Sequence, residues 1–553
     1  MMIGIDKIER SQGMAKMTGA QAIVKSLKKY GIDTIFTLPG AQLDNLFNAL
    51  YDEQDSIRTI HSRHESSAAY MAFGYAQASG KVGVCAVVPG PGLLNASAAI
   101  LTANSSNVPV LVLAGQVPSA FIDKGFGHLH ELPNQIDMIA AVAKWTARIE
   151  NPEDTPGIIR DAFKHLLSGP TRPVVLEMAP DKMGLEADVG IMDAISADDA
   201  PEGDPELIEK AAKFLASAKK PIIFAGGGAQ DAGEELLVLA EELQAPVALT
   251  VPGKGVVSDQ HYLAQNRISG HRFWKEADVG LIVGSRFTQP LSTLGWGWDW
   301  EKNTKVKLIQ IDILQGQIGQ TFKPEVGIVA DSKKCLTALI NTLQKTNSVR
   351  KSRKPEMQAA KKESLEFLSA KFKPQADYAA ILRQQLPEDG IFVTEATQVG
   401  YFCNVCFPVY HPRTFIQSGY QGNLGFGFAS ALGAKVATPD KKVISINGDG
   451  GFMYTSQELS TAVHHKINLV AVVFSDGAYS NVARIQEHIF NGKTIATELS
   501  NPDFVMYAKS FGAAARRAET PEALREAIRE GFDADVPMVI EVPIGRLPFM
   551  NMY

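Results

Sequence analysis

The stretch KVISINGDGG, residues 442–451, joins a β-branched run to a turn that carries three glycines. The run is typical of a buried strand, and a helix is expected after it, around residues 455–464. Glycines let a backbone come close to an anion, and a helix N-terminus offers free N–H donors with a positive dipole end. Asp449 inside this turn would repel a bare diphosphate unless a divalent cation lay between the two. The stretch therefore predicts a strand–turn–helix unit of an α/β domain that binds an anion together with a metal ion.

Similar strand-like runs recur along the chain in three series, with helical stretches between them. Strands that feed helices, with glycine at the carboxyl ends, are the pattern of doubly wound α/β domains. We therefore expect the α/β class, with three doubly wound domains and mainly parallel sheets. The other runs are GVCAVV (83–88), VPVLVLAG (108–115), PVVLEM (173–178), KPIIFAGGG (220–228), PVALTV (246–251), VGLIVG (279–284), VKLIQID (306–312), IFVTE (391–395), NLVAVVFSD (468–476) and MVIEVP (538–543).

Two composition shifts separate the three series. Residues 183–204 are acidic and loop-like, and residues 344–363 are polar, basic and interrupted by Pro355. Both are interpreted as surface linkers, the second with a solvated helix as an alternative, because charge runs of this kind are usually solvated. The predicted division is an N-terminal extension at 1–16, a first domain at 17–182, a linker at 183–204, a middle domain at 205–343, a linker at 344–372 and a third domain at 373–553.

The composition is that of a globular protein without a nucleic-acid or membrane partner. The 553 residues carry 54 Lys and Arg against 60 Asp and Glu, a formal net charge of −6, which gives no support for binding nucleic acid or an anionic membrane. No apolar run approaches the roughly 18 residues of a membrane span. The first residues lack the apolar core of a secretory signal, and the four cysteines are too scattered for a disulfide framework. A cytoplasmic enzyme is expected.

A second acidic turn follows the next predicted strand, in Phe474-Ser475-Asp476-Gly477-Ala478. Neighbouring parallel strands end side by side, so Asp449 and Asp476 are expected to reach one hard cation. Mg²⁺ binds few carboxylates and takes its other oxygens from the backbone, water and phosphate groups. The alternative is that Asp449 caps a helix and that Asp476 is an ordinary turn residue.

Gly448-Asp449-Gly450, followed at this spacing by Asp476-Gly477-Ala478, resembles the motif of thiamine-diphosphate-dependent enzymes. The resemblance implies that Asp449, Asp476 and the main-chain oxygen of Ala478 bind Mg²⁺. The second acid position of the motif is usually Asn, so Asp476 makes this variant more anionic. The same likeness extends the cofactor site over residues 448–480, with contacts expected from Gly448, Gly450, Gly451, Tyr479 and Ser480.

The first domain carries a matching set of motifs. Glu65 stands in His64-Glu65, followed by a small-residue helix that ends in Gly74-Tyr75-Ala76, as the catalytic glutamate of this family does. The resemblance implies that Glu65 acts on the aminopyrimidine ring of the cofactor and promotes formation of the thiazolium ylid. Judged by its position alone, Glu65 would be an early-helix acid that complements the helix dipole. The likeness adds as cofactor-binding residues Pro39, Gly40, Asn95 and Gln116 in the first domain, and Thr397, Gln398, Gly422, Asn423 and Leu424 in the third.

The motifs occur in the order pyrimidine-binding domain, middle domain, diphosphate-binding domain. This order is that of acetolactate synthase, pyruvate oxidase and benzoylformate decarboxylase relatives, and the overall likeness is greatest to acetolactate synthase large subunits. It implies that Glu65 of one chain meets Asp449 of another, with a homodimer as the minimal active unit and a homotetramer as the expected assembly. Gly226-Gly227-Gly228 resembles a middle domain that binds FAD in some relatives and an adenine nucleotide or nothing in others; a tight strand–helix turn is the alternative.

Two stretches depart from acetolactate synthase and concern the substrate. In GSRFTQP (284–290), Gln289 and Pro290 replace an acid and an arginine associated with the substrate channel of that enzyme. Where it has a Phe-Gln pair near the thiazolium, residues 126–132 read FGHLHEL. Histidine titrates near neutral pH, so this loop is a candidate for proton transfer, with a histidine-rich surface loop as the alternative. The candidate catalytic residues in it are His128, His130 and Glu131.

The resemblance implies a carboligase or decarboxylase, a transferase or lyase that acts on a 2-oxo acid through a thiazolium ylid and an enamine intermediate. Two alternatives stay open. One is a C–C bond hydrolase of a 1,2-diketone that uses the same cofactor, and the other is a non-catalytic nucleotide-binding or scaffold protein. The expected partner in the first two cases is a small-molecule 2-oxo acid or diketone.

Overall fold

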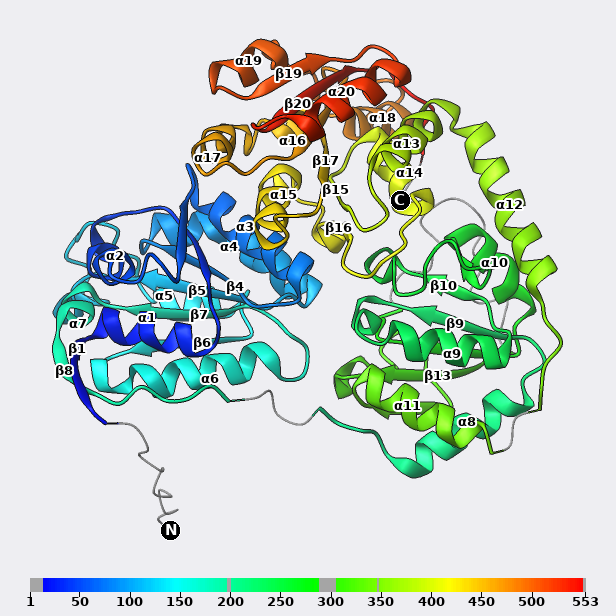
Figure 1. The fold of residues 1–553 in the computed structure, drawn as a ribbon, viewed down its shortest axis with the longest axis horizontal. Helices are drawn as coiled ribbons and strands as arrows, with labels where there is room; N and C mark the ends of the chain where they lie inside the picture. Colours follow the sequence, from blue (N-terminus) through cyan, green and yellow to red (C-terminus); the bar gives the residue numbers. More distant parts are fainter. Residues whose placement is uncertain (1–12, 196–199, 288–304, 346–347, 551–553) are drawn as a thin grey trace. The chain divides into compact units, whose positions relative to one another are not determined.

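The computed structural model describes residues 13–195, 200–287, 305–345 and 348–550. It contains three six-stranded sheets, and neighbouring strands run parallel in all three (Figure 1). Helices alternate with strands along the chain, so the predicted α/β class with three doubly wound domains is confirmed. The N-terminal sheet belongs to one compact unit, and the other two sheets belong to a second. In the part of the chain that the structure describes, no helix is long and apolar enough to cross a membrane.

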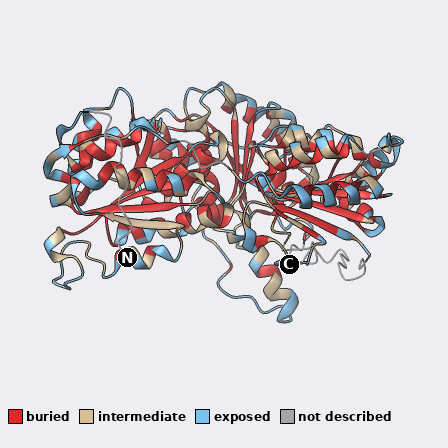
Figure 2. Ribbon diagram, turned by 90° about the horizontal axis from the view of Figure 1, so that it is seen from below, coloured by how far each residue is buried: buried red, intermediate tan, exposed pale blue. Residues whose placement is uncertain are grey.

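The first domain is built on a sheet with the strand order β3-β2-β4-β5-β7-β6. Buried residues follow the strands, as Figure 2 shows, because helices pack over the sheet. The order reverses between β2 and β4, and ligands of open α/β sheets bind beyond the carboxyl ends of the strands at such a point. The strands are β2 (Thr34–Thr37), β3 (Arg58–His61), β4 (Gly83–Val87), β5 (Val110–Gly115), β6 (Trp145–Ile149) and β7 (Val174–Met178); the helices are α1 (Gly19–Lys29), α2 (Asp44–Tyr51), α3 (Glu65–Ser79), α4 (Pro91–Ser106), α5 (Gln135–Ala140), α6 (Thr155–Leu167) and α7 (Pro180–Gly184).

A two-stranded antiparallel ribbon joins the two ends of the first domain. β1 (Ala15–Thr18) pairs with β8 (Glu186–Val189), and β8 lies inside the segment 183–204 that was predicted as a linker. Glu186 and Asp188 are exposed, while the residues between and after them turn inward. The acidic composition of the segment therefore reflects the solvent face of a half-buried strand as well as a loop.

The middle domain has the strand order β11-β10-β9-β12-β13-β14. Its order reverses between β9 and β12, where glycine-containing turns follow both strands. Helices α9 and α11 lie side by side over this sheet, with α8 against α11 (Figure 1). The strands are β9 (Pro221–Ala225), β10 (Val247–Leu249), β11 (Ala264–Gln265), β12 (Val279–Val283), β13 (Lys307–Asp312) and β14 (Val326–Val329); the helices are α8 (Pro205–Ser217), α9 (Gly233–Leu243), α10 (Arg267–Glu276) and α11 (Ser332–Leu343).

The third domain has the strand order β16-β15-β17-β18-β20-β19, with the reversal between β15 and β17. β17 and β18 are neighbours, as the run of strand-like segments predicted. The strands are β15 (Ile391–Thr394), β16 (Phe415–Ile416), β17 (Val443–Gly448), β18 (Val470–Ser475), β19 (Ala514–Arg517) and β20 (Met538–Pro543); the helices are α13 (Lys373–Gln385), α14 (Gln398–Cys406), α15 (Phe426–Ala437), α16 (Asp449–Phe452), α17 (Leu459–His464), α18 (Ser480–Ile489), α19 (Phe504–Ser510) and α20 (Pro521–Asp533).

Helix α12 (Lys354–Lys371) occupies much of the basic segment that was predicted as the second linker. Its buried Met357 and Ala360 belong to the core of the middle domain, and Leu368 belongs to the core of the third. These residues lie on one face of a helix whose other residues are mostly charged, which is why composition marks the segment as solvated. α12 packs against α10 and α13 and so connects the two domains as a folded element.

Candidate functional site

The turn predicted to bind the diphosphate lies at the carboxyl end of β17. Asp449 begins the short helix α16, and the helix expected at 455–464 is divided into a 3₁₀ turn and α17. A Cβ atom placed on Gly450 would lie 2.5 Å from the Tyr479 ring. Glycine at this position therefore lets Tyr479, which begins the turn into α18, pack directly on the backbone of the Asp449 turn.

The Asp449 carboxylate is buried and held by four N–H donors. Its Oδ1 accepts from Gly450 N at 2.8 Å, and its Oδ2 accepts from Gly477 N at 2.7 Å and from Asp476 N at 3.2 Å. The amide of Asn501 also donates to Oδ2, at 2.7 Å. Three of these donors come from outside the turn, so the carboxylate is fixed at the edge shared by β17 and β18.

Asp476 lies at the end of β18, next to Asp449. Gln398 Nε2 donates to Asp476 Oδ2 at 2.6 Å, and Ala478 N donates to Oδ1 at 3.3 Å. Burial raises the pKa of Asp476 and the charge of Asp449 raises it further, against the opposing hydrogen bond of Ser480. A divalent cation between two carboxylates would remove this repulsion, so the oxygen donors present fit Mg²⁺.

The main-chain oxygen of Ala478 takes no part in the backbone hydrogen bonds that hold the surrounding turn. Ala478 forms an isolated antiparallel bridge with Glu498, in which Leu499 N donates to Gly477 O at 2.8 Å. Among the described residues, no hydrogen bond to Ala478 O is formed. The bridge therefore holds the turn while leaving this oxygen available as a third hard ligand.

Thr397 and Gln398 begin α14, beyond the end of β15. The Thr397 hydroxyl accepts from Gly400 N at 2.9 Å and caps the helix. Gln398 Oε1 accepts from Arg484 Nη2 at 2.5 Å and from Leu547 N at 3.0 Å. The Gln398 amide thus ties the carboxylate of Asp476 to α18 and to the segment that follows β20.

The predicted residues Gly422, Asn423 and Leu424 form a turn before α15. Gly422 has a φ of 60° and Gly425 a φ of 78°, a region that glycine adopts without strain. A Cβ atom on Gly425 would lie 2.6 Å from Tyr454 Cβ. This close approach brings the turn against the residues that follow α16, and so beside the Asp449 turn.

In the first domain, Glu65 and Asn95 are brought together at the carboxyl ends of β3 and β4. Glu65 is the first residue of α3 and is 8 % exposed. Asn95 Nδ2 donates to Glu65 Oε2 at 3.0 Å, and a Cβ atom on Gly92 would lie 3.4 Å from Oε1. Pro39 and Gly40 follow β2, so the switch between β2 and β4 gathers the predicted residues of this domain on one edge.

The loop that carries His128 and His130 is attached to this edge. Gln42 Oε1 lies 3.0 Å from His130 Nδ1, and Gln42 Nε2 donates to Leu129 O at 2.8 Å. A Cβ atom on Gly90 would lie 2.4 Å from His130 O, so glycine is needed for the loop to approach the β4 turn. The His128 ring packs against Phe121 at a tilt of 32°, with the ring centres 4.1 Å apart.

Glu131 is engaged in shaping the loop. Its carboxylate accepts from Gly125 N at 2.8 Å, Gly127 N at 2.7 Å and His128 N at 3.0 Å. Desolvation would raise the pKa of Glu131, but these backbone N–H groups lower it below its ordinary value. A carboxylate stabilised in its ionised form by three N–H groups is a weak base, so the geometry favours a structural role for Glu131 over the predicted catalytic one.

Gln116 faces an interior polar network. Its Nε2 donates to Glu177 Oε2 at 3.3 Å, and Glu177 is 1 % exposed. Gln135 Nε2 donates to the same oxygen at 2.8 Å, and Arg148 Nε donates to Oε1 at 2.5 Å. Gln135 Oε1 in turn accepts from Gly90 N at 2.8 Å. Gln116 therefore supports the turn after β4 from inside, through a network that the sequence does not reveal.

The glycines of the middle domain are explained by backbone contact. A Cβ atom on Gly226 would lie 2.3 Å from Gly284 O, and Gly228 N donates to the same oxygen at 3.0 Å. This close approach favours the tight strand–helix turn over a nucleotide fingerprint. Gln289 and Pro290 lie outside the described residues.

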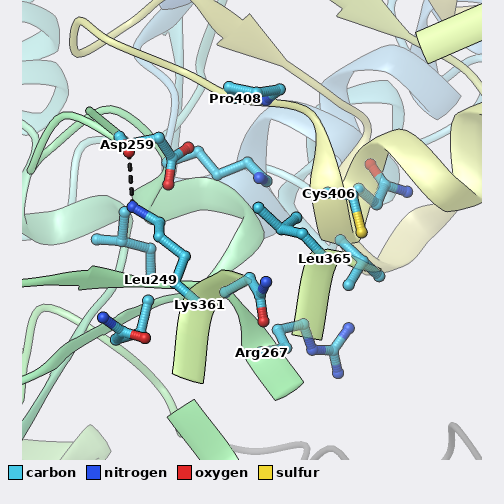
Figure 3. Close-up of a pocket in the computed structure, with 12 residues that line it drawn as sticks. Leu249, Asp259, Arg267, Lys361, Leu365, Cys406 and Pro408 are labelled. Carbon is cyan, nitrogen blue, oxygen red and sulfur yellow. Dashed lines mark hydrogen bonds between the residues drawn. The ribbon is translucent and has the colours of Figure 1, made fainter. Parts of the chain in front are cut away.

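A cavity of about 60 Å³ lies between the middle and third domains of the second unit (Figure 3). In it Lys361 reaches toward Asp259 and donates to its main-chain oxygen at 2.6 Å, and Lys254 Nζ donates to Phe407 O at 3.0 Å. None of the predicted site residues lines this cavity, and its volume suits a few water molecules. It is separate from the candidate site.

Asn501 and Glu395 were not singled out by the sequence, although both contact the candidate site. Asn501 reaches Asp449 from 52 positions away, and Gly425 N donates to Glu395 Oε1 from 30 positions away. Local spacing and composition carry no signal for such pairs, because the contact exists only after the sheet has formed.

Comparison with known proteins gives consistent matches over nearly the whole chain. The N-terminal TPP binding domain of thiamine pyrophosphate enzymes matches residues 17–140, the central domain matches 208–339 and the C-terminal TPP binding domain matches 395–542. A probable acetolactate synthase large subunit of Methanococcus aeolicus is 34% identical over 97% of this chain and 93% of its own length. A probable 2-ketoarginine decarboxylase of Pseudomonas aeruginosa is 32% identical over 96% and 95%, and the acetolactate synthase large subunit of Corynebacterium glutamicum is 30% identical over 97% and 88%.

These matches agree with the geometry of the strand ends. The match to the C-terminal TPP binding domain covers Asp449, Asp476 and Gln398, and the match to the N-terminal TPP binding domain covers Glu65 and Asn95. The chain belongs to the thiamine pyrophosphate enzyme family, is similar to acetolactate synthase large subunits along nearly its full length, and is a thiamine-diphosphate-dependent enzyme.

Proposed function

We propose that the protein is a carboligase or decarboxylase that acts on a 2-oxo acid with thiamine diphosphate and Mg²⁺. The observation that carries the proposal is the pair of carboxylates, Asp449 and Asp476, at adjacent strand ends with Ala478 O beside them. Mg²⁺ prefers such oxygen donors and takes its remaining ligands from water and phosphate. When bound, the cofactor supplies a nucleophilic carbon and an electron sink for C–C bond cleavage.

The roles of the protein residues follow from their positions. Asp449, Asp476 and Ala478 O would hold the metal, and the backbone around Gly450 and Gly451 would face the diphosphate from the start of α16. Glu65 is enclosed and bonded by Asn95, which suits a carboxyl group that holds and returns a proton beside the aminopyrimidine ring. Gln398 orients Asp476 in this scheme.

The names of the relatives support the substrate class. One describes the synthesis of acetolactate, and another describes the decarboxylation of a 2-keto acid. We further propose a homodimer as the minimal active unit and a homotetramer as the assembly, on the basis of the family resemblance. Light scattering coupled to size-exclusion chromatography measures the assembly directly.

The reaction is tested by incubating the full chain with thiamine diphosphate, Mg²⁺ and a panel of 2-oxo acids. Pyruvate, 2-oxobutyrate and a guanidino 2-oxo acid cover small and long cationic side chains. Release of CO₂ together with ligation products or aldehydes, read by mass, supports the proposal. If no member of the panel loses CO₂ while the cofactor is bound, the assignment to 2-oxo acids is wrong.

A second candidate is hydrolysis of a 1,2-diketone, and it is favoured by one observation, the hydrogen bond that holds His130 by Nδ1 against Gln42. If Nδ1 carries the proton, Nε2 is left as a base that could activate water. Cyclohexane-1,2-dione in place of the 2-oxo acid separates the two reactions, because ring opening by water gives a single acid without CO₂.

His130→Gln is expected to lower turnover by about 100-fold, because the amide keeps a polar group but cannot take up a proton. Thiamine diphosphate affinity, measured by calorimetry, should stay unchanged. His128→Gln is the matched comparison in the same loop, since that ring is held by packing against Phe121. Equal turnover in wild type and His130→Gln would restore the interpretation of a surface loop.

Asn501→Ala is expected to weaken Mg²⁺ binding by about 10- to 100-fold, because the amide that orients Asp449 is lost. Mg²⁺ affinity is measured by calorimetry in saturating thiamine diphosphate. Ser500→Ala changes the exposed neighbour and should bind Mg²⁺ as the wild type does. An unchanged affinity in Asn501→Ala would show that Asp449 is oriented by the backbone alone.

A further inference from the structure

Glu395 follows β15, and its carboxyl group lies inside the diphosphate-binding domain. Its side chain is 4 % exposed, and among the described residues Oε2 has no hydrogen-bond partner. Asp449 and Asp476 follow the next two strands of the same sheet, so acids stand at three adjacent strand ends. The proposed metal site uses two of them and leaves Glu395 without a role.

Glu395 lies between two turns on which the proposed cofactor site depends. At the start of α15, Gly425 N donates to Glu395 Oε1 at 2.5 Å. A Cβ atom on Gly451 would lie 2.4 Å from Oε1, and one on Gly427 would lie 3.1 Å from Oε2. Both approaches are tighter than ordinary van der Waals contact, so glycine at these positions lets the two turns close on the carboxyl group. One side chain thus connects the start of α15 to the start of α16.

We propose that Glu395 is a positioning residue that holds the turn at 422–427 and the turn at 448–451 at the spacing that the diphosphate of the cofactor requires. The inference rests on the proposed function and adds to it a residue that acts through two backbone turns. Because the Glu395 carboxyl group is enclosed, it does not contact a ligand directly. Its effect on cofactor binding is transmitted by the two turns.

The protonation state of Glu395 gives this role a measurable signature. Burial raises the pKa of Glu395 to about 8, and the N–H groups of Gly425, Gly427 and Phe426 oppose that shift only in part. No charged side chain contributes to the shift. The titratable side chains of the elements packed around it are Asp449 on α16 and Tyr454 just after α16, Lys435 in the last turn of α15, and Tyr401, Cys403 and Cys406 on α14. Glu395 therefore holds a proton at neutral pH and loses it as the pH rises through about 8.

An ionised Glu395 would place an unpaired charge between the two turns, so thiamine diphosphate should bind more weakly above that pH. We expect wild type and Glu395→Gln to bind equally at about pH 6.5, and wild type to bind about tenfold more weakly than Glu395→Gln at about pH 9. Calorimetric titration of the full chain with thiamine diphosphate in excess Mg²⁺ gives both affinities. Because titration of the cofactor itself affects both proteins equally, it cancels in the ratio of the wild-type affinity to the Glu395→Gln affinity.

Glu395→Ala removes the side chain and leaves Gly425 N without its acceptor, so it should bind the cofactor more weakly than wild type at every pH. Wild-type affinity in Glu395→Ala would overturn the positioning role. An alkaline loss that is the same in wild type and Glu395→Gln would overturn it as well, because the titrating group would then lie elsewhere.

Thermal unfolding of the protein without cofactor tests the buried acid independently of the proposed function. The unfolded chain loses the Glu395 proton near the ordinary value of 4.5 and the folded chain near 8, so the unfolded state binds fewer protons between these values. The wild-type Tm should therefore fall relative to that of Glu395→Gln as the pH rises from about 5 to about 8. A constant difference contradicts the inference about Glu395. If the wild-type Tm falls with rising pH as expected but the protein binds no thiamine diphosphate, the proposed function is contradicted instead.

Discussion

Asp449→Ala is expected to weaken thiamine diphosphate binding by about 100-fold or more, because the metal that joins the diphosphate to the protein loses a ligand. Asp449 is 2 % exposed and accepts from Gly477 N and Asn501 Nδ2, so its removal also leaves donors without acceptors. Each unpaired group costs about 1–3 kcal/mol of unfolding free energy. Calorimetric titration with thiamine diphosphate and Mg²⁺ measures the affinity, and a thermal melt of the apoprotein measures the stability.

Two further variants separate the loss of the metal from the loss of the fold. Asp449→Asn keeps the shape and one acceptor oxygen, so it should melt closer to wild type than Asp449→Ala while still binding the cofactor poorly. Asp440→Ala removes an exposed acid from the same domain and should change neither property. Tight Mg²⁺-dependent binding in Asp449→Asn would show that this carboxylate is not a metal ligand.

Glu65→Gln is expected to lower turnover by about 1000-fold and to leave cofactor binding nearly unchanged. The amide fills the same space beside Asn95 and Gly92, but it cannot hold and return a proton. Steady-state rates with the best substrate of the 2-oxo acid panel give the turnover, and calorimetry gives the affinity for thiamine diphosphate. Hydrogen–deuterium exchange at the reactive carbon of the bound cofactor should slow by a similar factor.

Glu153→Gln is the matched control, because Glu153 is exposed in the same domain and lies within a short 3₁₀ turn. It should show wild-type turnover. Full activity in Glu65→Gln would remove the catalytic role from Glu65 and return it to the interpretation of a helix-dipole residue. A loss of both turnover and cofactor binding would indicate that Glu65 only maintains the fold.

Hydrophobic patterning predicted the sheets and the place of the acids, because strands have to be buried and parallel strands end at the same edge. β17 and β18 were expected from their β-branched runs, and Asp449 Oδ2 is within hydrogen-bond distance of Asp476 N. The patterning did not reveal β8, and it offered a helix at α12 only as a solvated alternative to a linker. Both elements carry many exposed charged residues and few buried ones. Their composition therefore suggested linkers where the chain forms packed elements.

The motifs named candidate residues along the chain, but the contacts of their side chains depend on distant partners. The cofactor contact expected of Gln116 stays a prediction, while its amide joins the Glu177 network inside the domain. Glu131 was expected to act as a catalytic group, and its carboxylate is used by the backbone of its own loop. Such roles depend on which N–H groups converge on a carboxylate, and residue type and spacing do not specify this.

The sequence by itself determined the α/β class and the strand ends where the chemistry is expected, through the period of buried residues and the glycines and acids of short turns. The family and the cofactor came from the resemblance of these motifs to those of thiamine-diphosphate-dependent enzymes. Only the tertiary structure decided that Asn501 orients Asp449, that Gln398 ties Asp476 to Arg484, and that Glu395 lies enclosed between two glycine turns. Each of these is a contact between segments far apart in the chain, and it depends on how sheet edges and helix starts pack once the domain has formed.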